Sequence, residues 1–213
     1  LHKYALITKA INSTGNNLEN VKNAKRCFDM FNLEDVRYCV RGYNVKDSAD
    51  IFGVDDTQWA YESVNEGLYS SNDKFCIHSH TNSIEMQYCD YCRTSSYLFG
   101  CVSVRNKQHC ILNKQYTKEE YEAMVPKIIA HMNAMPYVDK KGRMYRYGEF
   151  FPIELSPFAY NESVVQEYYP LTKEEAEQQG FLWKEIELKY YQITKRPAAL
   201  PQESSAIADA IVD

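Results

Sequence analysis

Five potential metal ligands lie between positions 76 and 92. Cys76, His78 and His80 alternate along the chain, and Cys89 and Cys92 follow with the two-residue spacer typical of a zinc knuckle. Alternate residues of a strand share a face, so Cys76 and both histidines would point the same way. Thiolates and imidazoles are tetrahedral zinc ligands. The cluster is consistent with a closed structural zinc site, but we favour the interpretation in which Cys76 and Cys89 are small apolar residues inside a repeat.

Other patterns are weaker indications of catalysis. Glu149 with Glu154 or Glu162 could supply the paired carboxylates of a glycosidase, although sequence does not define their separation. His109 beside Cys110 does not indicate a thiol nucleophile, because adjacent strand residues face opposite sides. The chain contains no glycine-rich phosphate loop, HExxH or GxSxG pattern. The sequence therefore favours a protein without enzymatic activity.

Basic and aromatic side chains interleave at Arg143, Tyr145, Arg146 and Tyr147. Such a pattern can stack on single-stranded nucleic acid. The whole chain carries a net charge of −5, which argues against general binding to a phosphate backbone. Nucleic acid stays a candidate partner, and a packing role for these residues is the favoured interpretation.

The cysteines repeat at nearly every twelfth position. Counting from residue 27, one series recurs at every twelfth or thirteenth position, and Cys110 follows nine positions after its last member; the series is Cys27, Cys39, Ile51, Val64, Cys76, Cys89 and Cys101. No cysteine follows Cys110, and an odd total of seven argues against a secreted disulfide framework. We therefore expect reduced thiols and a cytoplasmic protein.

A unit of about 12 residues fits a short strand and a turn. Asn, Asp, Ser and Gly between the slots supply turn chemistry, and no proline occurs before Pro126. We predict a β-rich α+β protein: an N-terminal cap over residues 1–14, a parallel β-solenoid over 15–116, and an α+β capping module over 117–213. Two units would make a coil of about 24 residues, giving about four coils. An antiparallel meander is the alternative.

The residues beside the repeat slot are also apolar. Because neighbouring strand residues point to opposite faces, either the cysteines or their larger neighbours face the interior, and the other set needs a cover. The second half of the chain is the expected cover. Within it, Thr117–Glu120 and Thr172–Glu175 have the pattern of capping boxes, which predict helices beginning at residues 118 and 173.

Several long words resemble an uncharacterised protein family of candidate-phylum bacteria. The likeness covers most of residues 17–185; the words are YCDYC (88–92), RNKQ (105–108), NKQYTKEEY (113–121), GEFFPIELSPFAYNE (148–162) and YPLTKEEA (169–176). The resemblance implies no activity. It implies C-terminal paired-cysteine segments similar to zinc ribbons, which the printed sequence does not contain, so no residue here takes that role.

No apolar run approaches the roughly 20 residues that cross a bilayer, so we expect no membrane partner. Stacked coils provide extended surfaces, and we therefore expect a non-enzymatic binding or assembly platform for a protein or polymer. Uncapped ends would expose strand edges and lead to self-association. The alternatives are a carbohydrate-active or other hydrolase at the junction of solenoid and module, and a zinc-dependent nucleic-acid-binding module.

Overall fold

The computed structural model describes residues 6–64, 67–79, 81–163 and 165–185. The chain forms two compact units, Leu1–Pro157 and Phe158–Asp213, and each is described by itself. The predicted boundary between solenoid and module at residue 117 lies inside the first unit, because the helix that follows the solenoid packs on it. Residues 186–213 of the predicted module lie outside the described residues.

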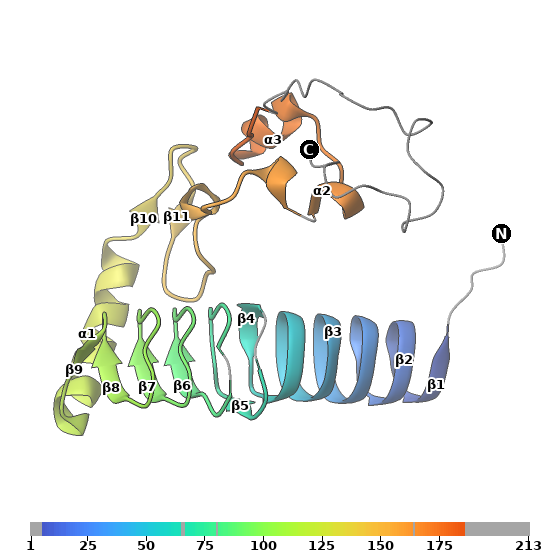
Figure 1. The fold of residues 1–213 in the computed structure, drawn as a ribbon, viewed down its shortest axis with the longest axis horizontal. Helices are drawn as coiled ribbons and strands as arrows, with labels where there is room; N and C mark the ends of the chain where they lie inside the picture. The colour runs from blue at the N-terminus through green and yellow to red at the C-terminus, as the bar shows by residue number, and fades with distance from the viewer. Residues whose placement is uncertain (1–5, 65–66, 80, 164, 186–213) are drawn as a thin grey trace, which may run out of the picture. The chain divides into compact units, whose positions relative to one another are not determined.

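The first unit is a parallel β-solenoid of about eight turns, as predicted (Figure 1). Its strands pair in parallel from one turn to the next, except that β9 returns antiparallel to β8. β1 already pairs with β2, so the segment predicted as a cap contains a solenoid strand. The strands are β1 (Ile7–Ile11), β2 (Thr14–Lys22), β3 (Lys25–Gln58), β4 (Tyr61–Val64), β5 (Ser70–Ser71), β6 (Ile84–Gln87), β7 (Ser96–Phe99), β8 (Gln108–Ile111) and β9 (Lys114–Gln115).

One turn of the solenoid takes roughly 12 residues, half the predicted number. Leu18 pairs with Met30 and Met86 pairs with Leu98, one repeat apart in each case, while Thr57 pairs with Ser70 after a one-residue insertion. The expected count of about four coils was therefore wrong by a factor of two. The repeat in sequence is the same whether one or two units close a turn, so periodicity alone did not decide it.

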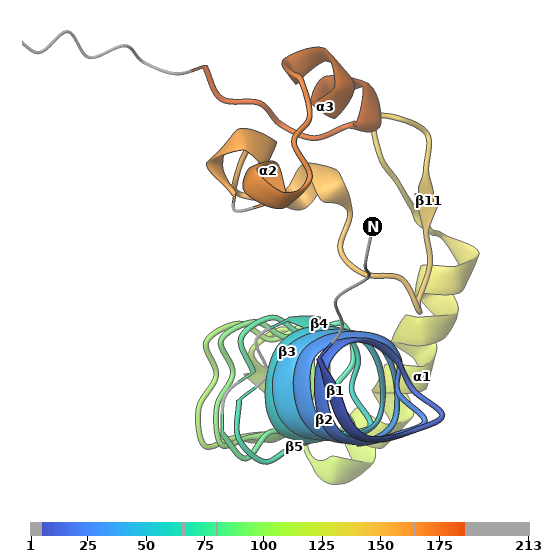
Figure 2. The ribbon, with the colours of Figure 1, turned by 90° about the vertical axis from the view of Figure 1, so that its right-hand side faces the viewer.

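A single repeat closes a turn because the chain bends at every third residue. The bending residues have positive φ, for example Asn17, Asn20, Asn23 and Arg26, with φ between 53° and 55°. Asn and Asp adopt this left-handed conformation at lower cost than other non-glycine residues. We call these positions corners. Between corners, one residue points inward and the next points outward, so a turn has four inward and four outward positions (Figure 2).

The inward residues form four columns along the solenoid axis. One column contains five of the seven cysteines; its members are Cys27, Cys39, Ile51, Ser63, Cys76, Cys89 and Cys101, each no more than 3% exposed. Two details of the predicted series were wrong. Ser63 rather than Val64 occupies the slot, because it pairs with Ile51. Cys110 lies in a different column, opposite Leu98.

Inward polar residues stabilise the next turn by accepting its backbone N–H groups. Ser48 Oγ accepts from Ala60 N–H at 3.0 Å, Ser63 Oγ from Cys76 N–H at 3.3 Å, and Asp73 Oδ1 from Met86 N–H at 3.0 Å. A buried donor left without a partner is costly, so these side chains replace ladder bonds inside the solenoid.

Amide ladders run along the outside at the corners. Asn20 donates to Asn32 at 2.8 Å, Asn32 to Asn44 at 2.8 Å, and Asn44 to Asp56 at 2.6 Å. Each bond joins equivalent corners of successive turns, so identical residues stabilise the stack through both their backbone preference and their side chains.

Asn32→Ala is expected to lower the free energy of unfolding by about 1–2 kcal/mol, because it removes two ladder bonds and places alanine at a φ of 57°. Asn32→Gly is the control, since glycine loses the same bonds but accepts the backbone conformation. Urea unfolding of both variants measures the difference. Equal losses for alanine and glycine would show that the corner conformation is not strained.

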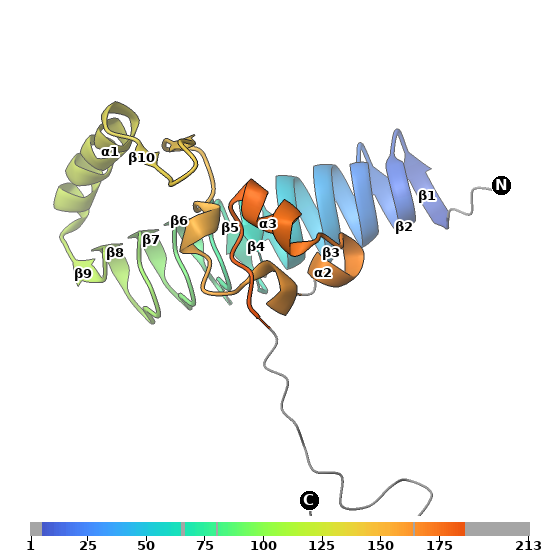
Figure 3. The ribbon, with the colours of Figure 1, turned by 90° about the horizontal axis from the view of Figure 1, so that it is seen from above.

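Helix α1 (Lys118–Ala134) covers one side of the last turns (Figure 3). It begins at the predicted capping box of Thr117 and Glu120 and continues through Pro126. Its buried Tyr121 and Val125 pack against Phe99 and Ile111, two outward residues of β7 and β8.

The thiols face the interior and their larger neighbours face outward, so the predicted cover exists, but only over the C-terminal turns. Phe28 and Tyr38, in the first turns, remain 44% and 48% exposed. The early part of the solenoid therefore presents outward aromatic residues that α1 does not reach.

A hairpin of β10 (Tyr137–Val138) and β11 (Met144–Tyr145) follows α1, and a 3-10 turn, η1 (Ile153–Leu155), follows the hairpin. The second unit contains η2 (Tyr160–Glu162), α2 (Val165–Tyr168) and α3 (Lys173–Gln179). α3 has the second predicted capping box and ends at Gly180, whose φ is 91°.

Candidate functional site

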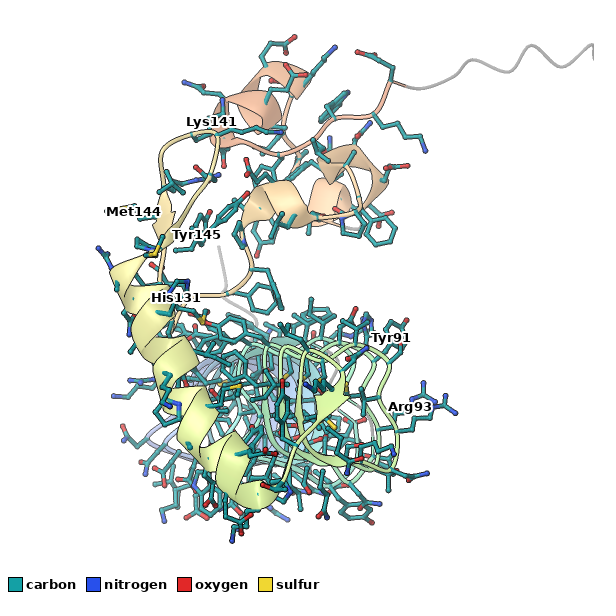
Figure 4. The ribbon with its side chains drawn as sticks, turned by 90° about the vertical axis from the view of Figure 1, so that its left-hand side faces the viewer. Tyr91, Arg93, His131, Lys141, Met144 and Tyr145 are labelled. Atoms are coloured by element: carbon teal, nitrogen blue, oxygen red, sulfur yellow. The ribbon has the colours of Figure 1, made fainter. Side chains whose placement is uncertain are left out.

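The predicted metal ligands lie on two sides of the solenoid wall. Cys76, Cys89 and Cys92 are fully buried inside, whereas the corner residue His78 lies outside, stacked on Tyr91 at 4.6 Å between ring centroids. Tyr91 projects outward on the side away from α1 (Figure 4). His80 lies outside the described residues. Within the described ranges, no group of three or more His, Cys, Asp or Glu side chains is arranged to hold a metal ion.

The interior thiols contact one another and the backbone. Hydrogen bonds to Cys101, Cys76 and Cys92, together with burial, raise the pKa of the Cys89 thiol well above its usual value. Cys76 Sγ donates to the Lys74 carbonyl at 3.3 Å, and Cys92 Sγ to the Cys101 carbonyl at 3.4 Å. A protonated, buried thiol is neither a nucleophile nor a metal ligand, so these contacts agree with a structural role.

The predicted basic and aromatic binding residues take part in internal contacts. Arg143 Nε donates to buried Asp139 at 2.6 Å, and Tyr145 OH donates to the same carboxylate at 3.3 Å. Tyr147 is half-buried and its OH donates to Gln87 Oε1 at 2.8 Å. Arg146 places its backbone N–H 2.6 Å from Glu149 Oε2. Tyr145 lies beyond the C-terminal end of α1 (Figure 4). The four residues therefore do not form one open surface.

The three acidic residues considered for catalysis each accept a local backbone N–H. Glu149 accepts from Arg146, Glu154 accepts from Lys140 and from the Tyr137 hydroxyl, and Glu162 accepts from Ala159. Glu154 has a lowered pKa, first because of the Tyr137 hydrogen bond. These contacts give the carboxylates a capping function in their own loops.

An open groove of about 720 Å³ runs along the solenoid on the face that α1 covers further on. We call it the axial groove. One rim is a corner column of amides and carboxylates with one aromatic, the other is an outward column containing three basic residues and a tyrosine, and the floor is made of small side chains. The lining includes Asn23, Asp35, Asp47, Trp59 and Asn72 on the first rim, Lys25, Arg37, Tyr61 and Lys74 on the second, and Val36, Ser48 and Ala60 on the floor.

Trp59 interrupts the Asn/Asp column of this rim. It is 53% exposed and has a φ of 58°, a conformation that costs an aromatic residue about 1–2 kcal/mol. The equivalent corners before and after it are Asp47 and Asn72, which suit that backbone better. A large exposed side chain in a strained conformation indicates selection for something other than stability.

The basic rim carries charge that the described part of the chain does not neutralise. No described residue forms a salt bridge with Lys25, Arg37 or Lys74. Tyr61 lies between Arg37 and Lys74 and packs edge-on against Phe75 at 5.7 Å. Burial, with the nearby Glu62, raises the pKa of Tyr61, so its hydroxyl stays protonated and donates to Glu62 at 3.1 Å. The groove thus offers donors and acceptors on opposite rims.

The cysteine spacing does not reveal this groove. A signal was present in the sequence, because Asn23, Asp35 and Asp47 are followed, at the same interval, by Trp59. It becomes visible only when corners, rather than the cysteine slots, are aligned.

None of the described helices is long and apolar enough to cross a membrane. Comparisons with family models, with curated proteins and with solved structures return no match to this chain.

Proposed function

We propose that this protein is a non-enzymatic binding platform for a polysaccharide chain that lies in the axial groove. Trp59 carries the proposal, because it is exposed, faces the groove and occupies a backbone conformation that disfavours it. Aromatic faces pack against the apolar faces of sugar rings, and rim amides and charges can bind hydroxyl groups.

The charges on the rims favour a sugar over a nucleic acid. Asp35 and Asp47 on one rim would repel phosphates, whereas hydroxyl groups can donate to these carboxylates and accept from Arg37 and Lys74. The groove continues over several turns at a spacing of about 4.8 Å per turn, which suits a repeating, extended ligand. The net charge of −5 also argues against a polyanion.

Trp59→Asn is expected to weaken polysaccharide binding by about tenfold or more, the typical effect of losing an aromatic anchor worth over about 1.4 kcal/mol. The same substitution should keep or raise stability, by up to about 1 kcal/mol, since Asn suits the corner. Binding is measured by affinity electrophoresis against soluble glucans, xylans and mannans. Fluorescence titration in a Trp183→Phe background then reports on Trp59 alone, because the chain has two tryptophans.

Tyr69→Asn is the matched control. Tyr69 is also an exposed aromatic corner, 65% exposed with a φ of 65°, but it does not line the axial groove. It should show the same stability effect with unchanged binding. Absence of binding to every polysaccharide, or equal binding by both variants, would refute the proposal. Trp59-dependent binding of a poly-dT oligonucleotide would also refute it, in favour of nucleic acid.

A further inference from the structure

A second surface of the solenoid carries an exposed stripe of apolar residues. It consists of the outward positions of one face, which stack at a spacing of one turn; we call Phe28, Val40, Phe52 and Val64 the apolar stripe. Phe28 and Phe52 are 44% and 42% exposed. The stripe shares no residue with the lining of the axial groove. Exposed apolar surface organised in this way typically marks an interaction site.

Size alternates along the stripe in the order large, small, large, small. If a second copy packs face to face in the antiparallel direction, Phe28 lies opposite Val64 and Val40 lies opposite Phe52. Every contact then joins a large side chain to a small one, which fills space without clashes. A parallel arrangement would place Phe28 on Phe28 and Val40 on Val40, leaving alternating clashes and gaps.

The corner column beside the stripe has a charge pattern that is complementary under the same operation. It reads Arg26, Tyr38, Asp50 and Glu62 along the axis. In the antiparallel arrangement Arg26 lies opposite Glu62 of the second copy, and Tyr38 lies opposite Asp50. Both pairs occur twice, once on each side of the two-fold axis, as an isologous interface requires. Arg26 and Asp50 are exposed, and Arg26 already lies over the Tyr38 ring at 5.7 Å.

The regular spacing of the turns argues for a second copy as the occupant. Side chains on this face recur at about 4.8 Å, and a partner can match them at four successive levels only if it repeats at the same interval. Another copy of this chain does so by construction. From these observations we propose that the apolar stripe is the interface of an antiparallel homodimer. The proposal is independent of the proposed function, because it involves a different face.

The interface spans four turns, which places it at the small end of specific interfaces, so the dimer dissociates with a constant on the order of 10–100 μM. Sedimentation velocity of the full chain over a concentration series tests it. Arg26→Glu alone and Glu62→Arg alone each place like charges opposite one another twice, and each is expected to weaken dimerisation at least tenfold.

The charge exchange supplies the decisive comparison. An equimolar mixture of the two single variants should form a heterodimer, and the double variant Arg26→Glu/Glu62→Arg should regain the parental homodimer. Arg105→Glu, the same charge change at an exposed position in a later turn, controls for net charge, and circular dichroism confirms folding. A monomer throughout the series, or a dimer insensitive to Arg26→Glu, would overturn the proposal. So would failure of the mixture to associate.

Discussion

Gly42→Ala is expected to destabilise the solenoid by about 3 kcal/mol, a large effect for one methyl group. Gly42 occupies an inward position, and a Cβ there would lie 2.2 Å from the carbonyl oxygen of Val54 in the next turn. Backbone cannot move away without breaking the parallel ladder. The same Cβ would lie 3.2 Å from Met30 Cε of the preceding turn, because the long methionine fills the space that glycine leaves.

Gly100→Ala is the matched control for this prediction. Gly100 is a corner with a φ of 62°, and its added Cβ would meet the flexible Leu112 side chain at 3.0 Å rather than backbone. The expected cost is about 1–2 kcal/mol, from the corner conformation alone. Urea unfolding followed by circular dichroism compares the two variants. Because turns of a solenoid can unfold separately, the midpoint and the slope are both recorded. Equal effects would show that the interior has room for the methyl group.

Asp73→Asn is expected to stabilise the protein at pH 8 and to change it little at pH 4. Asp73 is completely buried in an inward column; Met86 N–H donates to Oδ1, whereas Oδ2 has no partner among the described residues. Burial raises the pKa of this carboxyl to about 7, although hydrogen bonds from Met86 and Ser83 act in the opposite direction. Asparagine is neutral at every pH and can keep an oxygen for the Met86 N–H.

The direction of the pH dependence follows from proton binding. Between pH 4 and 7 the folded protein holds the Asp73 proton that the unfolded chain has lost, so stability falls as the pH rises. Above pH 7 both states are ionised at this site and the loss is complete, on the order of 4 kcal/mol for a pKa raised from 3.8 to about 7. Asp73→Asn should remove this slope from the overall profile.

Unfolding midpoints at pH 5, 6, 7 and 8 for the parent and for Asp73→Asn measure this effect. Glu19→Gln, which deletes an exposed carboxylate, controls for the change in net charge. Parallel profiles of the parent and Asp73→Asn would show that the buried carboxyl does not titrate in this range.

Interior and surface positions are expected to respond differently to substitution. The interior tolerates neither an added methyl at Gly42 nor, at high pH, a charge at Asp73, because its columns are closely packed and dry. The surface tolerates substitution at Trp59 and Arg26, where the expected losses are in binding. Stability and binding measurements on these variants therefore separate the scaffold from its surfaces.

The fold was largely predictable from the sequence because the repeat is strong. Cysteines and aliphatic residues at a nearly constant interval, with turn residues between them and no proline, predicted stacked parallel strands, which the structure shows. Thr117 and Thr172 with their glutamates predicted the starts of α1 and α3. These features are local: a capping box, a turn residue or a period depends on neighbours within about a dozen positions.

The candidate site was not predictable in the same way. Spacing placed Cys76, His78 and Cys89 together, but a left-handed corner at every third residue sent His78 outside while the thiols stayed inside. Strand alternation, the rule used for the sequence, does not hold for a chain that bends so often. The axial groove depends on where α1 stops covering its face, and no local pattern specifies that.

By itself, then, the amino-acid sequence determined the period, the parallel stacking and the helix starts, since each arises from backbone preferences and neighbouring side chains. Only the tertiary structure decided that a single repeat closes a turn, that the thiols face inward, and that Trp59 borders an open groove. Those outcomes depend on contacts between turns and with α1, and such contacts exist only once the whole stack has formed.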